Sequence, residues 1–202
     1  MDDKIKIRNY AIEKFLKDGF YKISMDEIAS DLGMSKKTIY KYFPSKEKLV
    51  EEVSISFREE VKNKIVEIIN SKDNAVIKIV SLMREIGNLF VKVNEKMTID
   101  LQKHMPGLWK GIDEFRTKQI NKFLSSVIEQ GKKEGLIIDL PTEIVMTIHI
   151  ASVRAVVNPT FIMNNKFSFK EAMEYTFKII LNGILTEKGK EIFYKSTNGT
   201  NI

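Results

Sequence analysis

The 202-residue sequence contains no cysteine, which excludes a disulfide framework, a thiolate metal site and a cysteine nucleophile. It also lacks an apolar run that could cross a bilayer, because its most apolar stretch, residues 144–157, is short and contains His149 and Arg154. The first residues, Met-Asp-Asp-Lys, do not form the basic region and apolar run of a signal peptide. We therefore expect a soluble cytoplasmic protein with no membrane partner.

Catalytic motifs are missing as well. There is no glycine-rich phosphate loop, no G-x-S-x-G motif and no zincin pattern. Asp100 and His104 lie four residues apart on one predicted helix, but no third metal ligand follows at a defined spacing. In an apolar helix, His149 is more often a core residue, and Arg154 more often forms an internal ion pair. We expect no enzymatic activity, no metal and no cofactor.

The charge of the chain is moderately positive, with a net value of +6 and a pI near 9.2. This balance favours a polyanionic partner without identifying one. The distribution is more informative, because five lysines and a single acidic residue, Glu47, fall between Lys36 and Lys48. Tyrosines interleave with these lysines, and cations beside aromatic hydroxyls suit a phosphate backbone. The alternative is a solvated lysine face without a partner.

Two short helices joined by a tight turn are predicted in the same region. Ser24 and Glu27 have the spacing of a capping box, in which each side chain accepts from the other residue's backbone N–H. Gly33 supplies the positive φ that ends the first helix, Ser35 caps the second, and Pro44 ends it. This pattern is a helix-turn-helix, whose second helix enters the DNA major groove.

The rest of the chain also has helical periodicity, with no convincing strand and no internal repeat. An N-terminal helix with Ile7, Ala11 and Phe15 on one face should complete a three-helix core with the helix-turn-helix. The core residues expected from the helix-turn-helix are Ile28, Leu32, Ile39 and Phe43. Helices are predicted over residues 3–18, 45–70, 75–94, 96–103, 108–133, 141–157 and 169–188, with 161–167 irregular and 190–202 frayed. The predicted fold class is all-α.

Several short motifs occur together between residues 5 and 52. They are Ile28-Ala29, Gly33-Met34-Ser35, Thr38-Ile39-Tyr40, Tyr42-Phe43 and Lys46-Glu47 with Leu49, preceded by Ile7, Ala11, Phe15 and Gly19-Phe20. These residues resemble the DNA-binding end of the tetracycline-repressor (TetR-type) family of bacterial regulators. The resemblance implies a homodimeric transcriptional regulator, most often a repressor, which dimerises through its last two main helices and holds an effector between inner helices.

Lys36 and Lys37 are the predicted base readers, because they open the second short helix and lysine can donate to guanine. Thr38 could meet a thymine methyl group or a phosphate. The alternatives are phosphate contact alone for the two lysines and core packing for Tyr40. With the positions that the resemblance adds, the predicted DNA-binding residues are Ser24, Met25, Ser35, Lys36, Lys37, Thr38, Tyr40, Tyr42 and Lys46.

Dimerisation follows from geometry as well as from the resemblance. A second helix of about 12 Å covers only a few base pairs, so specific binding needs two copies about 34–36 Å apart, or a multiple, on a roughly palindromic operator. Small residues on the penultimate main helix and an apolar stripe on the last one suit an interface, although both could face the monomer core. The predicted interface residues are Ala151, Ser152, Ala155, Met173, Phe177, Ile180 and Ile184.

An effector pocket is implied by the resemblance alone. Large aromatic side chains and pliable methionines suit an apolar ligand, and ordinary core packing is the alternative for each residue. The candidates are Met83, Phe90, Met97, Leu101, Met105, Trp109, Phe115, Phe123 and His149.

We therefore expect a helix-turn-helix DNA-binding domain over residues 1–48, a helical effector-binding and dimerisation domain over 49–195, and a disordered tail over 196–202. The expected function is a homodimeric repressor that a small apolar effector releases from a palindromic double-stranded DNA operator. One alternative is a constitutive DNA-binding protein whose helical domain only dimerises. The other is an enzyme with an accessory DNA-binding end, which would need a convergent set of titratable groups.

Overall fold

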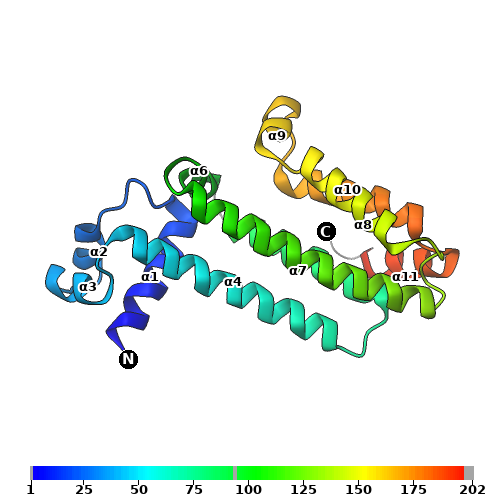
Figure 1. Cartoon of the computed structure of the whole chain (residues 1–202), viewed down its shortest axis with the longest axis horizontal. Helices are drawn as coiled ribbons and strands as arrows, with labels where there is room; N and C mark the ends of the chain where they lie inside the picture. Colours follow the sequence, from blue (N-terminus) through cyan, green and yellow to red (C-terminus); the bar gives the residue numbers. More distant parts are fainter. Residues whose placement is uncertain (1, 93–94, 198–202) are drawn as a thin grey trace. The chain divides into compact units, whose positions relative to one another are not determined.

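The computed structural model describes residues 2–92 and 95–197, but not the side chains of residues 89–92, 95, 116, 159 and 169. Within these residues the chain is helical, as predicted, and its extended pairing is one isolated bridge between Ile137 and Leu185 (Figure 1). The helices are α1 Asp3–Asp18, α2 Met25–Asp31, α3 Lys36–Tyr42, α4 Lys46–Asn70, α5 Ala75–Lys92, α6 Glu95–His104, α7 Pro106–Lys133, α8 Thr142–Val156, α9 Pro159–Asn165, α10 Phe169–Ile184 and α11 Glu187–Thr197.

The chain packs as two compact units. The first contains Met1–Asn63 and Val91–Thr117, and the second contains Lys64–Phe90 and Lys118–Ile202. Helices α4 and α7 each have residues in both units. The division predicted after residue 48 concerns function and stays a prediction, whereas these units are defined by packing.

The core of the first unit confirms the predicted three-helix arrangement. Ile7, Ala11 and Phe15 on α1 are fully buried, and so are Ile28 and Ile39 from the two short helices. The remaining buried members are Phe20, Ile23, Met25, Ala29, Phe43, Leu49, Val50, Val53, Met97 and Leu101, with Leu32 packed partly against them. Because Met97 and Leu101 come from α6, the helix-turn-helix shares its core with a helix far along the chain.

Local hydrogen bonds explain where the short helices begin. The Ser24 hydroxyl accepts from the Glu27 N–H at 3.0 Å, and the Ser35 hydroxyl accepts from the Thr38 N–H at 3.0 Å. The reciprocal half of the predicted capping box is wrong: the Glu27 carboxylate instead lies 3.3 Å from the Lys14 ammonium of α1. That ion pair joins α1 to α2.

Two predictions for the second unit are wrong. Residues 161–167 were expected to be irregular, but α9 forms there because the Asn158 side chain accepts from the Phe161 N–H at 2.9 Å and proline opens the helix. Residues 190–197 were expected to fray, but they belong to α11, where Phe193 is buried and the Thr186 hydroxyl accepts from the Gly189 N–H. Residues 198–202 of the predicted tail lie outside the described residues.

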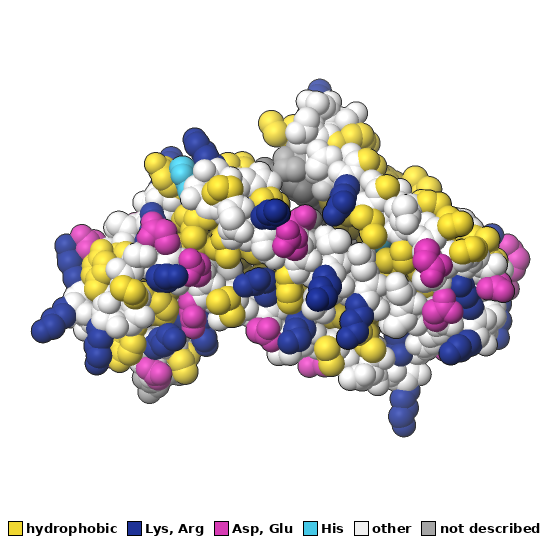
Figure 2. Space-filling view, in the orientation of Figure 1, with side chains coloured by type: hydrophobic (Ala, Val, Ile, Leu, Met, Phe, Trp, Pro, Cys, Tyr) yellow, Lys and Arg dark blue, Asp and Glu magenta, His cyan; other side chains and the backbone are white. Residues whose placement is uncertain are grey.

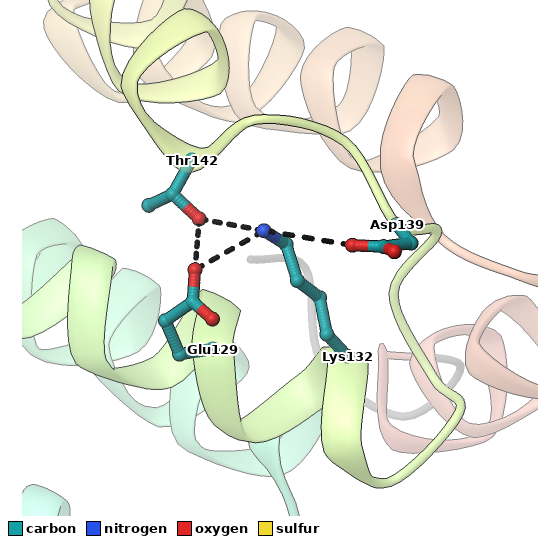
Figure 3. Close-up of polar contacts among 4 residues, drawn as sticks. All are labelled: Glu129, Lys132, Asp139 and Thr142. Carbon is teal, nitrogen blue, oxygen red and sulfur yellow. Dashed lines mark hydrogen bonds and ion pairs between the residues drawn. The ribbon is translucent and has the colours of Figure 1, made fainter.

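A polar cluster fixes the start of α8 against the end of α7 (Figure 3). The Lys132 ammonium donates to the Thr142 hydroxyl at 2.8 Å and to the Glu129 carboxylate at 3.1 Å, and lies 4.0 Å from Asp139. The Thr142 hydroxyl also donates to Glu129, and this hydrogen bond, followed by that from Lys132, lowers the pKa of the Glu129 carboxyl. Pro141 gives α8 no side-chain cap, so this cluster holds the first turn of the helix.

Candidate DNA-binding surface

Helix α3 has one buried face and one exposed face. Ile39 is fully buried in the core of the first unit, while Lys36, Lys37, Tyr40 and Lys41 are exposed. Figure 2 shows Lys and Arg side chains gathered at the end of this unit where α3 lies in Figure 1. Packing through Ile39 therefore turns a row of cations and a tyrosine toward solvent.

The two predicted base readers lie in different environments. The Lys36 ammonium donates to the Asp26 carboxylate of α2 at 2.6 Å, and this hydrogen bond raises the pKa of Lys36. Lys37 makes no hydrogen bond or ion pair with any described residue. The first turn of α3 contains no acidic residue, so both lysines stand unfavourably at the positive end of the helix dipole.

Tyr40, Tyr42 and Met25 differ in how far their side chains are exposed. Tyr40 is 46% exposed, so the alternative that it belongs to the core is wrong. Tyr42 is half-buried, with the Lys41 ammonium 5.3 Å from its ring centroid. The Met25 side chain is buried in the core, so only its backbone remains available for the predicted DNA contact. Ser24, Ser35 and Thr38 hold helix-start hydrogen bonds, and their DNA contacts stay predictions.

The side chain of Lys46 forms hydrogen bonds within the protein. Its ammonium donates to the carbonyl oxygens of Phe20 at 3.3 Å, Tyr21 at 2.7 Å and Ile23 at 3.1 Å. An ammonium has three N–H donors, so these carbonyls use its whole capacity. In this structure Lys46 positions the loop between α1 and α2, and its predicted DNA contact would require these bonds to be given up.

The same loop is held from its other side by α6. One oxygen of the Asp100 carboxylate accepts from the backbone N–H groups of Phe20 and Tyr21, each at 2.8 Å, and the His104 ring stacks on the Tyr21 ring with centroids 3.7 Å apart. The two side chains that were considered as a metal pair therefore bind the loop. No group of three His, Asp or Glu side chains in the described part of the chain could hold a metal ion.

Gly19 makes this close approach possible, which leads to a stability prediction. Gly19 and Gly33 both have positive φ, 77° and 62°, but a Cβ on Gly19 would lie 2.6 Å from the Asp100 carboxylate, whereas a Cβ on Gly33 would meet nothing within 4 Å. Alanine should cost about 1–2 kcal/mol of unfolding free energy at Gly33 because of its left-handed φ. It should cost at least as much at Gly19, whose φ of 77° and ψ of 171° lie in a region that essentially only glycine populates. Gly19→Ala should cost about 1–3 kcal/mol more, because Asp100 must leave two N–H groups.

Urea denaturation of both variants measures this difference. In an Asp100→Ala background the extra cost of Gly19→Ala should shrink, because the carboxylate that lies nearest the new Cβ is gone, although the Lys96 Cβ, 3.1 Å away, still crowds it. Equal costs in the wild-type background would show that the loop yields without losing the Asp100 bonds.

In the second unit, α8 and α10 pack together and expose an apolar face. Its large members are Ile144 and Ile148 on α8 and Tyr175 and Ile179 on α10, with Ile179 75% exposed. In Figure 2 hydrophobic side chains run along the edge of the molecule over these helices.

Only part of the predicted interface lies on this side. Ala151 and Ala155 are exposed and Ser152 is half-buried, but Phe177 and Ile184 are buried in the monomer core, and Met173 and Ile180 are half-buried. The stripe predicted on α10 is thus largely its inward face.

The predicted effector residues are distributed over both units. In the first unit, Met97 and Leu101 belong to the core, with Met105 and Trp109 packed partly against it, and the Arg58 guanidinium lies over the Phe115 ring. In the second unit, Met83, Phe123 and His149 are buried. The side chain of Phe90 lies outside the described residues. Effector binding by any of these residues stays a prediction.

Burial of His149 predicts a pH dependence of stability. Desolvation lowers the pKa of His149 from 6.5 to about 4, with the Phe177 ring 5.1 Å away. Between these values the unfolded chain binds a proton that the folded chain does not, so stability rises with pH. Lowering the pH from about 6.5 to 4 should cost wild type up to about 3 kcal/mol through this group.

The measurement is urea denaturation at a series of pH values for wild type, His149→Gln and His104→Gln. The His149 variant should lose this part of the pH dependence. His104→Gln is the matched control, because it removes the other histidine, in the first unit, and should keep it. An unchanged pH profile in His149→Gln would contradict the assignment.

Helices α2 and α3, which share a core with α1 and leave the lysines of α3 exposed, have the arrangement of a helix-turn-helix, whose second helix enters the DNA major groove. Residues 7–53 match the family model described as bacterial regulatory proteins of the tetR family. The chain therefore carries, over residues 7–53, the DNA-binding domain of the tetR family of transcriptional regulators. This relationship points to a regulator rather than an enzyme.

The similar proteins extend over nearly the whole chain. An uncharacterized HTH-type transcriptional regulator of Bacillus subtilis (strain 168), YvaF, is 23% identical over 93% of this chain and 97% of its own. A transcriptional regulator from Cytophaga hutchinsonii has a similar structure, with a TM-score of 0.67 and 20% identity over 92% of this chain and all of its own. A TetR-family regulator from Agrobacterium tumefaciens has a TM-score of 0.67 and 15% identity, covering 91% of this chain and 97% of its own.

No helix in the described part of the chain is long and apolar enough to span a membrane.

Proposed function

We propose that the protein is a homodimeric repressor that reads a palindromic operator through α3 and acts in the cytoplasm. The observation that carries this proposal is the orientation of α3, with Ile39 buried and Lys36, Lys37 and Tyr40 exposed. Lysines at the start of a recognition helix are placed to donate to base edges, while the other cations of the surface bind phosphates.

The proposed dimer uses the exposed face of α8 and α10. Helix α3 has seven residues and contacts only a few base pairs, so a single copy of α3 gives little sequence specificity. An exposed face that carries Ile144, Ile148, Tyr175 and Ile179 suits a self-complementary interface, as two-fold dimers require. The small exposed residues Ala151 and Ala155 on α8 would allow close approach of the partner.

We also propose that a small apolar effector releases the operator. The described contacts offer a route, because α6 carries both the Asp100 and His104 contacts to the α1–α2 loop and the effector candidates Met97 and Leu101. A ligand that displaced α6 would therefore disturb the α1–α2 loop, which leads into the helix-turn-helix. Such a ligand must bind free protein more tightly than operator-bound protein, by the factor through which it weakens operator binding.

A constitutive DNA-binding protein remains the second candidate, and one observation favours it. Met83, Met97, Leu101 and Phe123 are each at most 5% exposed and pack as ordinary core. In that case, no apolar compound would stabilise the protein against heat, and none would alter its operator affinity.

Binding of the purified protein to the DNA upstream of its own gene, against random DNA of equal length, tests the first candidate. The comparison is made at two salt concentrations. A clear preference for the upstream DNA at both supports a sequence-reading regulator. Equal binding that weakens steeply with salt indicates that phosphate contacts dominate, and it contradicts an operator in that DNA.

A further inference from the structure

The pair formed by Lys36 and Asp26 combines a predicted base reader with an acid on the DNA-binding surface. Lys36 opens α3, Asp26 lies in the first turn of α2, and the Nζ–Oδ2 distance is 2.6 Å. Both side chains are more than half exposed, at 67% and 54%. An exposed ion pair of this kind contributes little to stability, so a purely structural role is a weak account of it.

A carboxylate at this position has a cost for a protein that binds DNA. DNA presents closely spaced phosphate charges, and each lysine that neutralises one strengthens binding to any sequence. Asp26 cancels the charge of Lys36 in the free protein and repels a phosphate that approaches it. Lys37, the neighbouring lysine, has no such partner among the described residues. The two predicted readers therefore differ in how readily a random phosphate can bind them.

We propose that Asp26 is a specificity-determining residue, which keeps Lys36 from contributing to binding at random DNA and releases it only where base acceptors replace the carboxylate. This inference rests on the proposed function, because it assumes that Lys36 reads an operator. At a matched site the ammonium exchanges Asp26 for acceptors on a base edge, such as guanine O6 and N7. At an unmatched site it stays on Asp26, so the protein dissociates more readily. Asp26 thus gives specificity by weakening binding to unmatched DNA, and not by strengthening binding to the operator.

The test compares full-length wild type with Asp26→Asn, using two probes of equal length. One is the duplex that wild type enriches from a random-sequence library, and the other is a scrambled duplex of the same composition. Asp31→Asn is the matched control, because it removes the same charge from the same helix, where Asp31 pairs with Lys14 and Tyr10 instead of a reading lysine. Lys36→Met and the double variant Asp26→Asn with Lys36→Met complete the set.

Asp26→Asn should bind the scrambled duplex about three- to tenfold more tightly, with a log–log salt slope steeper by about 0.9 per subunit, because one more phosphate is neutralised. Its affinity for the enriched duplex should change less, so the ratio of the two affinities falls at least about threefold. Asp31→Asn should alter each affinity by less than about twofold. In the Lys36→Met background the effect of Asp26→Asn on either affinity should fall below about twofold, the size expected for Asp31→Asn.

Two results would overturn the inference while leaving the proposed function intact. One is that Asp26→Asn and Asp31→Asn raise the affinity for both duplexes by the same factor, which would indicate a general charge effect. The other is an unchanged effect of Asp26→Asn when Lys36 is absent. If wild type enriches no sequence from the library, the proposed operator reading itself is wrong, and the inference is overturned with it.

Discussion

Replacing Lys37 by alanine should weaken operator binding at least about 30-fold, while binding to random DNA falls by a smaller factor of about three- to tenfold, because one phosphate contact is lost there. Lys37 is exposed at the start of α3 and has no partner among the described residues, so it is free to donate to a base edge. One such contact discriminates between bases by about 1–3 kcal/mol, and a homodimer loses it twice. Each 1.4 kcal/mol is a tenfold change in affinity, which sets the lower bound of about 30-fold.

Fluorescence anisotropy with operator and scrambled duplexes measures both effects. Lys41→Ala is the matched control, because Lys41 is an exposed lysine on the last turn of the same helix, with its ammonium over the Tyr42 ring. It should weaken binding to both duplexes by the same modest factor. Equal losses on both duplexes for Lys37→Ala as well would reduce Lys37 to a phosphate contact.

Replacing Ile179 by aspartate should convert the protein to a monomer, because a hydrophobic contact between the protomers is lost. Operator binding should weaken at least about a hundredfold, because a monomer has only one copy of α3 to bind the DNA. Ile179 is 75% exposed on α10, so the folded monomer tolerates the change. In a two-fold interface two new carboxylates, one from each protomer, would also be buried.

Analytical ultracentrifugation gives the oligomeric state, and the same binding assay gives the affinity. Ile55→Asp is the control, because Ile55 is another exposed isoleucine, 48% exposed, and it belongs to α4 in the first unit. That variant should stay dimeric. A dimeric Ile179→Asp protein with full operator affinity would exclude this face as the interface.

The helix-turn-helix was predictable because its determinants are local. Ser24 and Ser35 cap their helices through residues three positions away, and Ile7, Ala11 and Phe15 share a face by helical spacing alone. Such short-range rules need no knowledge of the tertiary structure. The buried and exposed faces of α3 followed from the same spacing.

The partners of the charged residues could not be predicted in this way. Lys46 binds carbonyls more than twenty positions earlier in the sequence, and Asp100 binds N–H groups about eighty positions away. Nothing in the local sequence distinguishes these two side chains from solvated ones. The Lys36–Asp26 pair likewise depends on how α2 and α3 pack.

The predicted interface residues on α10 show a different limit of the sequence analysis. Helical spacing identified the most apolar stripe of α10 as the interface. In the structure, Phe177 and Ile184 of that stripe are buried in the monomer core. The exposed face carries Tyr175 and Ile179, which lie between the members of that stripe in the sequence. Because α10 is apolar on both sides, periodicity alone could not separate its buried face from its exposed face.

In the proposed dimer, two copies of α3 read one operator from the same side of the duplex. Hydroxyl-radical footprinting of wild type on its enriched duplex tests this arrangement most directly. We predict two protected segments of related, inverted sequence, with centres about 34–36 Å apart or a multiple of that distance. A single protected segment, or two segments on opposite faces of the duplex, would contradict the dimeric reading of the operator.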